Sequence, residues 1–596
     1  MCGIVACITS KNVEKKLIEN LKLLEYRGYD SAGIATIKNN KLSITKQVGN
    51  ISNLENMIKD SENSIGIAHT RWATHGKATT NNAHPHSSND LSWAIVHNGI
   101  IENYNILKNE LLIKGYTFLS LTDTEVIANL MQDNNLANLI ETIIKTCDFL
   151  NGSFALAILN KNKADTLYLA KRKSPLYLAK SDNEILVASD PICFIDKVNQ
   201  YYTFEDDEFC EASLKDIIFY NKNGEIIKKT ATILNTYNSS TSKLHYSHYM
   251  LKEIEETPQI LKELALKYRD HNIFDRLNNL NFNEFNKIIL LGCGTAYHAG
   301  LMAKAFIENF ARIDANAYIS SEFRYSNPLL DSRSLVICVS QSGETADTLM
   351  AQELAKSKGA TTIALTNVLH STLARQCDYY LPTYAGPEIS VASTKAYSAQ
   401  ISILNMLAKY ISNRMNNTQI DYISEIIELT SKISFNNKES LKEIADTIKN
   451  SHSIFFIGKG LDYITCQEAS LKLQEVTYIN AQAYPSGELK HGFLALVDDD
   501  SYVFVVATNK ELLEKTLNGA HEAQSRGAKI IIVSQYDISV DLLSDTYKFI
   551  KIQSVTEDLM PIISIIPFQQ ISYFTSTKKG INPDQPRNLA KSVTVE

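Results

Sequence analysis

Short apolar runs separated by polar segments make up most of the first part of the chain. Each run has the length and composition of a buried strand, and several of the segments between them carry helical patterns. The clearest runs are Gly3–Ile8, 65–68, 93–96, 154–159 and Ile185–Ala188. The pattern predicts one strand-rich domain with intervening helices over residues 1–240.

The pattern changes in the second part of the chain. A charged stretch with Tyr and His residues, 243–256, precedes Thr257-Pro258 and predicts a helical connector within 241–279. From about residue 280, strands, glycine turns and helices alternate, which is typical of parallel βαβ layers. We therefore expect a multidomain α/β protein whose later domains contain doubly wound parallel sheets.

This α/β pattern occurs twice. An apolar run leads into Gly-Cys-Gly at 292–294, and a second run leads into Gly-Lys-Gly at 458–460, 166 residues later. Gly359 and Gly527, each before a later apolar run, are 168 residues apart. A nearly constant offset indicates a tandem duplication. The predicted copies cover 280–420 and 445–585, and a C-terminal tail covers 586–596.

Composition narrows the class of protein. The 596 residues include 59 Lys and Arg and 66 Asp and Glu, so no broad basic surface is available for nucleic acid. The nine cysteines form no CxxC pair, which argues against a zinc site or a disulfide framework and favours the reducing cytoplasm. We found no secretory signal pattern and no run near the about 20 apolar residues that a membrane helix needs.

Cys2 is the first candidate for chemistry. If the initiator methionine is removed, Cys2 carries both a thiol and a free α-amine, whose ordinary pKa is about 7.7–8.0. The amine can then accept the proton of its own thiol, which is the arrangement of an N-terminal nucleophile and favours acyl transfer. The alternative is a small apolar residue at the start of a buried strand.

Polar residues follow or precede predicted elements at 69–76, 97–99 and 122–125. A thiolate attacking a primary amide needs donors for the oxyanion, and the Asn98 side chain and the Gly99 N–H can supply them. An arginine suits the α-carboxylate of a glutamine substrate, and an aspartate suits its α-ammonium group. Taken separately, each segment also fits an ordinary turn or a helix cap.

Together these segments resemble the class II glutamine amidotransferases and, more narrowly, the isomerizing glutamine–fructose-6-phosphate aminotransferases, or glucosamine-6-phosphate synthases. The resemblance implies an αββα glutaminase domain with Cys2 as nucleophile and with Asn98 and Gly99 as oxyanion hole. It implies glutamine contacts at Arg71, Trp72, Thr74, His75 and Asp123, and Trp72 as the gate of an internal ammonia channel. The motifs are Cys2-Gly-Ile-Val, Tyr26-Arg-Gly-Tyr-Asp-Ser-Ala-Gly33, His69-Thr-Arg-Trp-Ala-Thr-His-Gly76, Asn82-Ala-His-Pro-His86, His97-Asn-Gly-Ile-Ile-Glu102 and Thr122-Asp-Thr-Glu125.

A metal site is a further possibility to test against the sequence, because His75, His84 and His86 lie close together in the chain. No acidic or thiolate ligand joins them at regular spacing, and no HExxH motif is present. We therefore expect no metal ion and no other cofactor.

The first α/β copy contains a candidate phosphate site. The apolar run 335–339 ends in Ser340-Gln-Ser-Gly-Glu-Thr345 before a helical pattern, so hydroxyls and free N–H groups gather at a helix start. The alternative is an ordinary capped turn. The motif resembles the sugar isomerase domain, which implies that Ser340, Gln341, Ser342 and Thr345 hold phosphate and that Thr295, Val391 and Ser393 contact the sugar.

The second copy lacks that run and reads Ala507-Thr-Asn-Lys510 instead. Glu468, Lys472 and Glu475 fall on one helix face, where the alternative is a solvated Glu–Lys surface. The loop at 486–492 looks like the catalytic loop of the family. By resemblance, His491 opens the sugar ring, Glu475 transfers a proton, Glu468 and Lys472 support it, Lys591 forms a Schiff base, and Ala590 contacts substrate.

The resemblance covers the whole chain and implies that L-glutamine and fructose 6-phosphate give L-glutamate and glucosamine 6-phosphate, with ammonia passing internally in a homodimer. Three positions depart from the expected pattern: Ala296, Ser390 and Phe493. Ala296 and Phe493 leave open a synthase-like paralogue, either an amidotransferase acting on another sugar phosphate or a deglycase. A non-enzymatic sugar-phosphate sensor is a third reading, but it has no use for Cys2, Glu475, His491 and Lys591.

Overall fold

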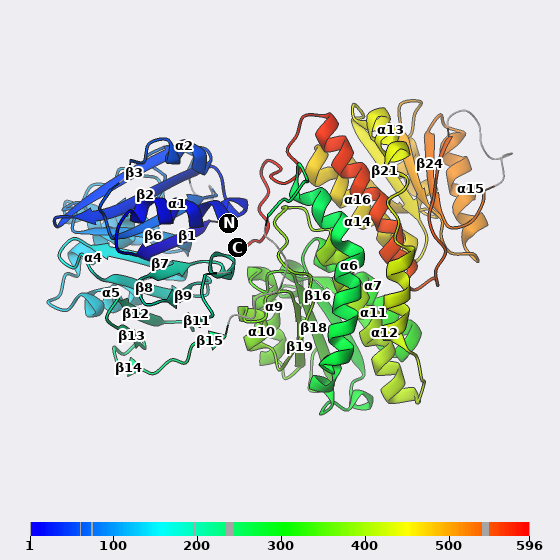
Figure 1. The fold of residues 1–596 in the computed structure, drawn as a ribbon. Coiled ribbons are helices and arrows are strands. Elements are labelled where there is room, and N and C mark those ends of the chain that lie inside the picture. Colours follow the sequence, from blue (N-terminus) through cyan, green and yellow to red (C-terminus); the bar gives the residue numbers. More distant parts are fainter. Residues whose placement is uncertain are drawn as a thin grey trace. The chain divides into compact units, whose positions relative to one another are not determined.

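The computed structural model describes residues 2–59, 61–72, 76–195, 197–233, 242–538 and 547–594. The chain divides into two compact units, Met1–Asn238 with Ser592–Glu596, and Ser239–Lys591. Each unit has its own sheets and its own core, so we describe them separately (Figure 1).

The first unit contains two antiparallel sheets. In the eight-stranded sheet the order is β15-β11-β9-β10-β1-β4-β2-β3, and in the seven-stranded sheet it is β14-β13-β12-β8-β7-β6-β5. The strands of the first sheet are β1 (Gly3–Ile8), β2 (Ser31–Lys38), β3 (Lys41–Val48), β4 (Ile65–Arg71), β9 (Tyr177–Lys180), β10 (Ile185–Ala188), β11 (Gln200–Thr203) and β15 (Thr232–Ile233). Those of the second are β5 (His86–Ser87), β6 (Trp93–Ile101), β7 (Gly152–Asn160), β8 (Leu167–Arg172), β12 (Glu208–Ala212), β13 (Ile217–Tyr220) and β14 (Ile226–Ile227).

Alternating side chains bury both faces of each sheet. In β1, Ile4, Ala6 and Ile8 join the core between the two sheets, whereas Val5 and Cys7 join the core beneath α1. This follows from the two-residue period of a strand. Helices α1 (Val13–Leu23) and α2 (Ile51–Glu55) cover the first sheet, and α3 (Tyr104–Ile113), α4 (Glu125–Asp133) and α5 (Leu139–Asp148) cover the second. The layers are therefore αββα, as predicted.

The second unit contains two parallel five-stranded sheets of the same topology. Their orders are β17-β16-β18-β19-β20 and β22-β21-β23-β24-β25, in which the second strand along the chain lies at one edge. The first sheet consists of β16 (Lys287–Gly292), β17 (Asp314–Ile319), β18 (Ser334–Ser340), β19 (Thr361–Thr366) and β20 (Tyr379–Pro382). The second consists of β21 (Ser453–Gly458), β22 (Asn480–Pro485), β23 (Tyr502–Val506), β24 (Lys529–Ser534) and β25 (Tyr547–Lys551). The predicted duplication is confirmed.

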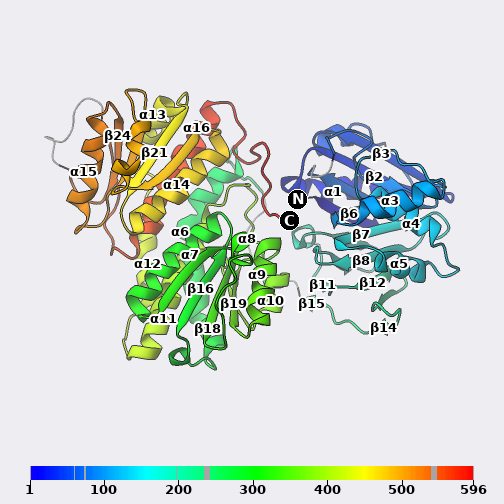
Figure 2. The same ribbon diagram turned by 180° about the vertical axis from the view of Figure 1, so that it is seen from behind.

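One apolar core runs through both repeats, and helices from each repeat contribute to it. Figure 2 shows these helices from the opposite side. The helices in the shared core are α6 (Tyr249–Asp270), α7 (Thr295–Phe306), α11 (Lys395–Asn416), α12 (Tyr422–Lys432), α13 (Lys438–Ile448), α14 (Leu461–Thr477) and α16 (Met560–Lys578). Smaller cores within the single repeats include α8 (Ser320–Phe323), α9 (Ala346–Ser357), α10 (Thr372–Gln376) and α15 (Leu513–Gln524). Among the described residues, none of the helices combines the length and apolar character that crossing a bilayer requires.

One long helix lies within the predicted connector, 241–279. The helix α6 begins at Tyr249 and continues through Pro258 to Asp270, whereas proline ordinarily breaks a helix interior. Its apolar face continues on both sides of the proline, with Ile254 before it and Leu261 after it fully buried. Burial of this face outweighs the lost backbone hydrogen bond.

Candidate active sites

Cys2 lies at the edge where β1 meets the end of β4. The pairing of Gly3 with Thr70 sets this position, and the Cys2 Sγ accepts a hydrogen bond from the Trp72 N–H at 3.3 Å. Burial raises the pKa of the Cys2 thiol, while the Trp72 N–H and the Arg71 guanidinium act in the opposite direction. The thiol therefore needs a base to react near neutral pH.

Asn98 and Gly99 lie in β6, and the Asn98 side chain contacts the backbone of Cys2. The Asn98 Nδ2 donates to the Cys2 carbonyl at 3.0 Å, so the amide group faces Cys2. Gly99 has φ +138°, and a Cβ there would lie 2.0 Å from the Ser153 carbonyl oxygen. Only glycine fits this backbone position. Asn98 and the predicted nucleophile are thus brought together, and Gly99 follows Asn98 in the same strand.

A cluster of four buried histidines lies behind Asn98; we call His69, His84, His86 and His97 the histidine cluster. The rings of His69 and His84 stack with centroids 4.1 Å apart. Burial lowers the pKa of every member, that of His69 to about 3, so all four are neutral near pH 7. The His84 ring is hydrogen-bonded to the Thr124 hydroxyl, and the His86 ring is hydrogen-bonded to the Thr122 hydroxyl. These two histidines therefore contribute to the packing of the domain.

The orientation of Asn98 depends on His69. The His69 Nε2 lies 3.1 Å from the His97 carbonyl oxygen and 3.0 Å from the Asn98 Oδ1. Because a carbonyl oxygen can only accept, Nε2 must carry the hydrogen. The Asn98 oxygen therefore points to His69, and its NH₂ group points to Cys2.

Arg71 and Asp123 approach Cys2 from two different elements. Arg71 ends β4 with a buried side chain, and its Nη2 donates to the Gly76 carbonyl at 3.4 Å. Asp123 precedes α4, and its Oδ2 accepts from the Ile101 N–H at 2.8 Å. Both charges act on the Cys2 thiol. One cation and one anion therefore flank the nucleophile, which suits the two charged groups of a free amino acid.

The remaining predicted glutamine contacts are less fully described. The Trp72 ring packs edge-on against Tyr29, with centroids 5.7 Å apart. Thr74 and His75 lie outside the described residues.

The predicted phosphate turn joins β18 to α9. The Ser340 Oγ accepts from the Gly343 N–H at 3.0 Å and lies 3.2 Å from the Thr345 Oγ1. The Ser342 Oγ accepts from the Glu344 N–H at 3.2 Å, and the Gln341 carbonyl accepts from the Asn367 N–H. Hydroxyls and backbone N–H groups thus converge at a helix start, as an anion site requires.

Glu468, Lys472 and Glu475 lie on one face of α14, but this face is buried. The Lys472 Nζ lies 2.5 Å from Glu475, 3.5 Å from Glu468 and 3.0 Å from the Thr295 Oγ1, and the His298 Nδ1 lies 2.7 Å from Glu468. Burial acts to lower the pKa of Lys472, but Glu475 and Glu468 raise it overall. Glu468 is 0% and Glu475 is 21% exposed, so Glu475 is the carboxylate accessible for proton transfer. The solvated-surface alternative is excluded.

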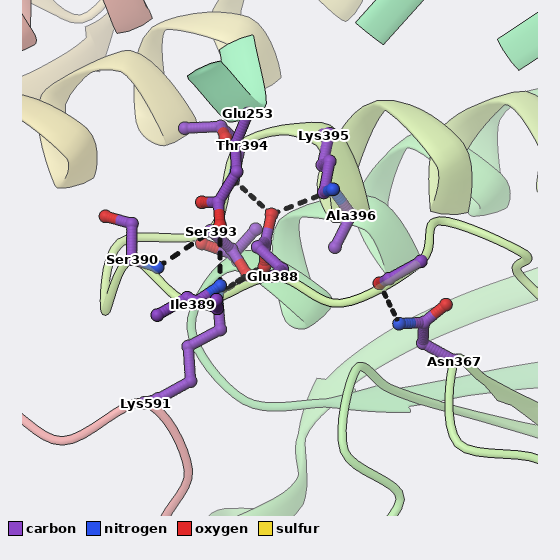
Figure 3. A network of polar contacts seen from close by, with 12 residues as sticks. Glu253, Asn367, Glu388, Ile389, Ser390, Ser393, Thr394, Lys395, Ala396 and Lys591 are labelled. Atoms are coloured by element: carbon purple, nitrogen blue, oxygen red, sulfur yellow. Dashed lines mark hydrogen bonds and ion pairs between the residues drawn. The ribbon is translucent and has the colours of Figure 1, made fainter. Parts of the chain in front are cut away.

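Lys591 reaches a second buried carboxylate in the same unit. Its Nζ forms an ion pair with Glu388 and lies 3.3 Å from the Ser393 Oγ (Figure 3). The Val391 N–H donates to the Asp584 carbonyl, which ties this loop to the segment before the tail. Ala590, next to Lys591, is half-buried. Glu388 also acts electrostatically on Lys472, so the two lysines share one region.

His491 ends the 3₁₀ helix Leu489–His491 with an exposed side chain. Within the described part of the chain, no polar contact joins it to Glu475 or Lys591. The structure of one chain therefore does not bring this predicted residue to the others.

The three departures from the family pattern have simple environments. Phe493 is buried, stacks on Tyr484 at 4.3 Å and packs against Phe455 at 4.6 Å. Ser390 is buried, and Ala296 is half-buried in the first turn of α7. None of these three positions removes a polar group from the Glu468–Lys472–Glu475 cluster or from the Glu388–Lys591 pair.

The second repeat has a carboxylate at its corresponding turn. A Cβ on Gly292 would lie 2.6 Å from the Ala296 backbone carbon, and one on Gly458 would lie 2.6 Å from that of Asp462, so the two turns correspond. Asp462 accepts from the Thr508 N–H at 2.8 Å. Burial raises the pKa of Asp462 to about 6. The chain's own carboxyl group thus occupies the strand end that binds anions in such sheets.

Sequence reasoning did not find Glu388, Glu253, His69 or Asp462 as site residues. His69 lies within a motif that we quoted, and its distance from the nucleophile in the chain gave no indication of its role. Glu388 and Glu253 are single acids in a loop and in a helix, and no spacing rule singles out such residues.

The family comparisons agree with this organisation. Residues 69–196 match the model of the glutamine amidotransferase domain, and residues 282–410 and 447–575 each match that of the SIS domain. The isomerizing glutamine–fructose-6-phosphate aminotransferase of Caldanaerobacter subterraneus subsp. tengcongensis is 40% identical over 611 residues, and that of Clostridium acetobutylicum is 39% identical over 615 residues. Both alignments cover 100% of this chain and 100% of the relative.

A solved structure is also similar. The C-terminal domain of glucosamine-fructose-6-phosphate aminotransferase from Francisella tularensis has a TM-score of 0.54 and 34% sequence identity. The match covers 58% of this chain and 100% of that chain.

Proposed function

The chain belongs to the family of isomerizing glutamine–fructose-6-phosphate aminotransferases, and we propose that it converts L-glutamine and D-fructose 6-phosphate to L-glutamate and D-glucosamine 6-phosphate. This reaction is the first step of the hexosamine pathway. The observation that carries the proposal is the presence, in one chain, of the Cys2–Asn98 pair and the buried Glu468–Lys472–Glu475 cluster. The first suits amide cleavage, and the second suits proton transfer.

In the glutaminase reaction, removal of Met1 frees the Cys2 α-amine, which accepts the thiol proton. The thiolate attacks the amide carbon, and the Asn98 Nδ2 and the Gly99 N–H stabilise the oxyanion. Collapse of this intermediate returns the proton to the leaving nitrogen and releases ammonia. Water then hydrolyses the thioester to glutamate. Arg71 and Asp123 hold the α-carboxylate and the α-ammonium group, with Trp72, Thr74 and His75 as further contacts.

In the sugar reaction, Ser340, Gln341, Ser342 and Thr345 hold the phosphate, while Thr295, Val391, Ser393 and Ala590 line the sugar. His491 opens the ring by proton transfer. The Lys591 amine adds to the C2 carbonyl and water leaves, which gives an imine that ammonia then displaces. Glu475 removes a proton from C1 and returns it to C2, which yields the aldose, with Glu468 and Lys472 orienting it.

We propose that ammonia passes internally from Cys2 to C2 of the sugar, with Trp72 as its gate. Two chemistries in one chain support this, because ammonia released to water would be lost to the second reaction. We expect glutamine hydrolysis to rise when fructose 6-phosphate is bound. Glutamate release, measured with and without the sugar phosphate, tests this; equal rates would contradict coupling.

We also propose a homodimer in which His491 of one copy acts in the sugar site of the other. The exposed side chain of His491, without a polar contact to Glu475 or Lys591 in the described chain, supports this. Sedimentation of the wild type, together with activity restored by mixing His491→Ala and Glu475→Ala subunits, tests it.

The direct test of the function is product formation by wild type and Cys2→Ala. We expect equal amounts of glutamate and glucosamine 6-phosphate from the wild type and neither from Cys2→Ala. Synthesis of the amino sugar from glutamine by Cys2→Ala would overturn the assignment of the nucleophile.

A further inference from the structure

Two buried glutamates contact the same loop in the second unit. Glu388 lies within this loop, and Glu253 reaches it from α6 (Figure 3). They are 5% and 1% exposed, respectively. Two carboxyl groups so close together and so deeply buried cannot both carry a charge at low cost.

Glu388 has partners for both of its oxygens. Its Oε1 accepts from the Thr394 N–H at 2.9 Å and from the Ala396 N–H at 3.0 Å, at the start of α11. Its Oε2 accepts from the Ser393 Oγ at 2.7 Å and pairs with Lys591. Burial acts to raise the pKa of Glu388, but the Lys591 charge and these donors lower it to about 2. Glu388 is therefore an ionised carboxylate held in one orientation.

Glu253 is in the opposite state. Its Oε1 accepts from the Ile389 N–H at 2.6 Å and from the Ser390 N–H at 3.3 Å, and its Oε2 has no partner among the described residues. Burial, and then the charge of Glu388, raise the pKa of Glu253 to about 8. The pair thus carries one negative charge at neutral pH, and that charge is on Glu388.

The other charged groups of this region have partners of their own. The Lys395 Nζ lies 2.8 Å from Glu256, and Lys472 lies in its cluster on α14. The cations that act on Glu253 or Glu388 are Lys395, Lys472 and Lys591, and only Lys591 forms an ion pair with Glu388 within the described chain.

We propose that Glu388 is a positioning residue that fixes the Lys591 amine at the sugar site, and that its negative charge opposes the proton loss that must precede imine formation. This inference rests on the proposed function, in which Lys591 forms the imine.

The chemistry requires this control. An ammonium has no lone pair, so Lys591 must lose a proton to solvent before its nitrogen can add to the C2 carbonyl. Addition is followed by loss of water and gives the imine. A neighbouring carboxylate favours the charged form of an amine, and removal of its charge favours the neutral form. Without the charge of Glu388, imine formation should therefore begin at lower pH.

The experiment traps the imine in the full-length protein. Wild type and Glu388→Gln are incubated with fructose 6-phosphate and cyanoborohydride between about pH 5.5 and about pH 9.5, a range that spans the change. Mass spectrometry of the peptide containing Lys591 then measures the fraction modified. The glutamine side chain retains an oxygen for the Thr394 and Ala396 N–H groups. We expect the midpoint of trapping to fall by about 1 pH unit or more.

Two matched variants separate charge from structure. Glu253→Gln has the shape of the neutral Glu253 and leaves Glu388 charged, so below the pKa of Glu253, about 8, its trapping should match that of the wild type. Asp558→Asn removes a carboxylate from another buried lysine, Lys409, whose Nζ lies 2.5 Å from Asp558. It should lower stability without moving the midpoint.

The outcomes distinguish a failure of the proposed imine from a failure of the proposed role of Glu388. Absence of a Lys591 adduct in the wild type would overturn the imine in the proposed function. A wild-type adduct with the same midpoint in Glu388→Gln would overturn the inference alone. If Glu388→Gln does not fold, Glu388→Asp retains the charge but moves it by one methylene. We then expect a wild-type midpoint with a smaller modified fraction, and a displaced midpoint would contradict the proposal.

Discussion

At the scale of single residues, the glutaminase site depends on the direction in which one amide group points. Asn98 can stabilise an oxyanion only through its NH₂ group, and the neutral His69 ring fixes that orientation by donating to the Asn98 oxygen. Because burial lowers the pKa of His69 to about 3, the ring keeps the same tautomer throughout the working pH range.

We predict that His69→Leu lowers the kcat of glutamine hydrolysis by about tenfold, because the amide can then rotate, with less effect on KM. Asn98→Ala, which removes the donor itself, should lower kcat by about 10²–10³. His69→Gln, whose amide can donate to Asn98, should recover part of the rate. Initial rates of glutamate release measure all three, and a wild-type kcat in His69→Leu would contradict this role.

The residues that could be predicted from sequence are those that lie in motifs. Cys2 was identified by its position directly after Met1, Asn98 by its place after an apolar run, and Glu475 by its helical spacing together with the family resemblance. Glu388 has no such context, since its partner Lys591 is far away in the chain and the contact depends on tertiary folding. His491 was predicted as a site residue, but its partners are not established within one chain.

At the scale of elements, the two repeats use the same turn differently. In the first repeat the turn after β16 carries Ala296, and the strand end at β18 presents hydroxyls. In the second, Asp462 accepts hydrogen bonds from Thr508 at the end of β23. The duplication could be predicted from the offset of the glycine turns. The contact of the Asp462 carboxyl group with Thr508 could not, because it depends on which side chain reaches the neighbouring strand.

We predict that Asp462→Asn changes stability in a pH-dependent way. Because burial raises the pKa of Asp462 from 3.8 to about 6, the folded state binds the proton more tightly, and wild-type stability falls as the pH rises through this interval. The asparagine does not titrate. The advantage of wild type over Asp462→Asn should therefore shrink by up to about 3 kcal/mol between about pH 4 and about pH 6.

Urea unfolding of both proteins, followed by circular dichroism, measures this difference. Asp558→Asn provides the control, because burial and the Lys409 charge together leave the pKa of Asp558 lowered rather than raised. A constant difference between wild type and Asp462→Asn across this interval would contradict the account.

At the scale of the whole molecule, the two units bury different titratable groups and should respond differently to acid. The first unit contains the histidine cluster, whose members are neutral when folded. Below the ordinary histidine pKa of 6.5 the unfolded chain binds protons that the folded cluster does not. The stability of the first unit should therefore fall as the pH falls below about 6.5.

This prediction can be tested because Trp72 and Trp93, the two tryptophans of the chain, both lie in the first unit. We expect the thermal midpoint reported by tryptophan fluorescence to fall between pH of about 7.5 and about 5, each histidine contributing at most about 1.4 kcal/mol per pH unit. His86→Gln should weaken this dependence. A midpoint that does not change over this range would show that the cluster does not control acid stability.

The order of the domains could be predicted because each contains its own motifs. The parallel-sheet layers follow from the alternation of strands and helices, whereas the αββα layers were implied by the family resemblance. The exact boundaries of the domains stay a prediction, and so does the homodimer, because an interface between copies leaves no periodic signal in one sequence. The helix α6 passes through Pro258 because the burial of its apolar face, a tertiary effect, outweighs local propensity.

The central claim is that this chain transfers the amide nitrogen of glutamine to fructose 6-phosphate. Mass spectrometry of the reaction with amide-¹⁵N-glutamine, in the presence of unlabelled ammonium, tests it most directly. We predict ¹⁵N-labelled glucosamine 6-phosphate from the wild type and none from Cys2→Ala. Glutamate without a labelled amino sugar would contradict the claim, because the nitrogen would then have another acceptor.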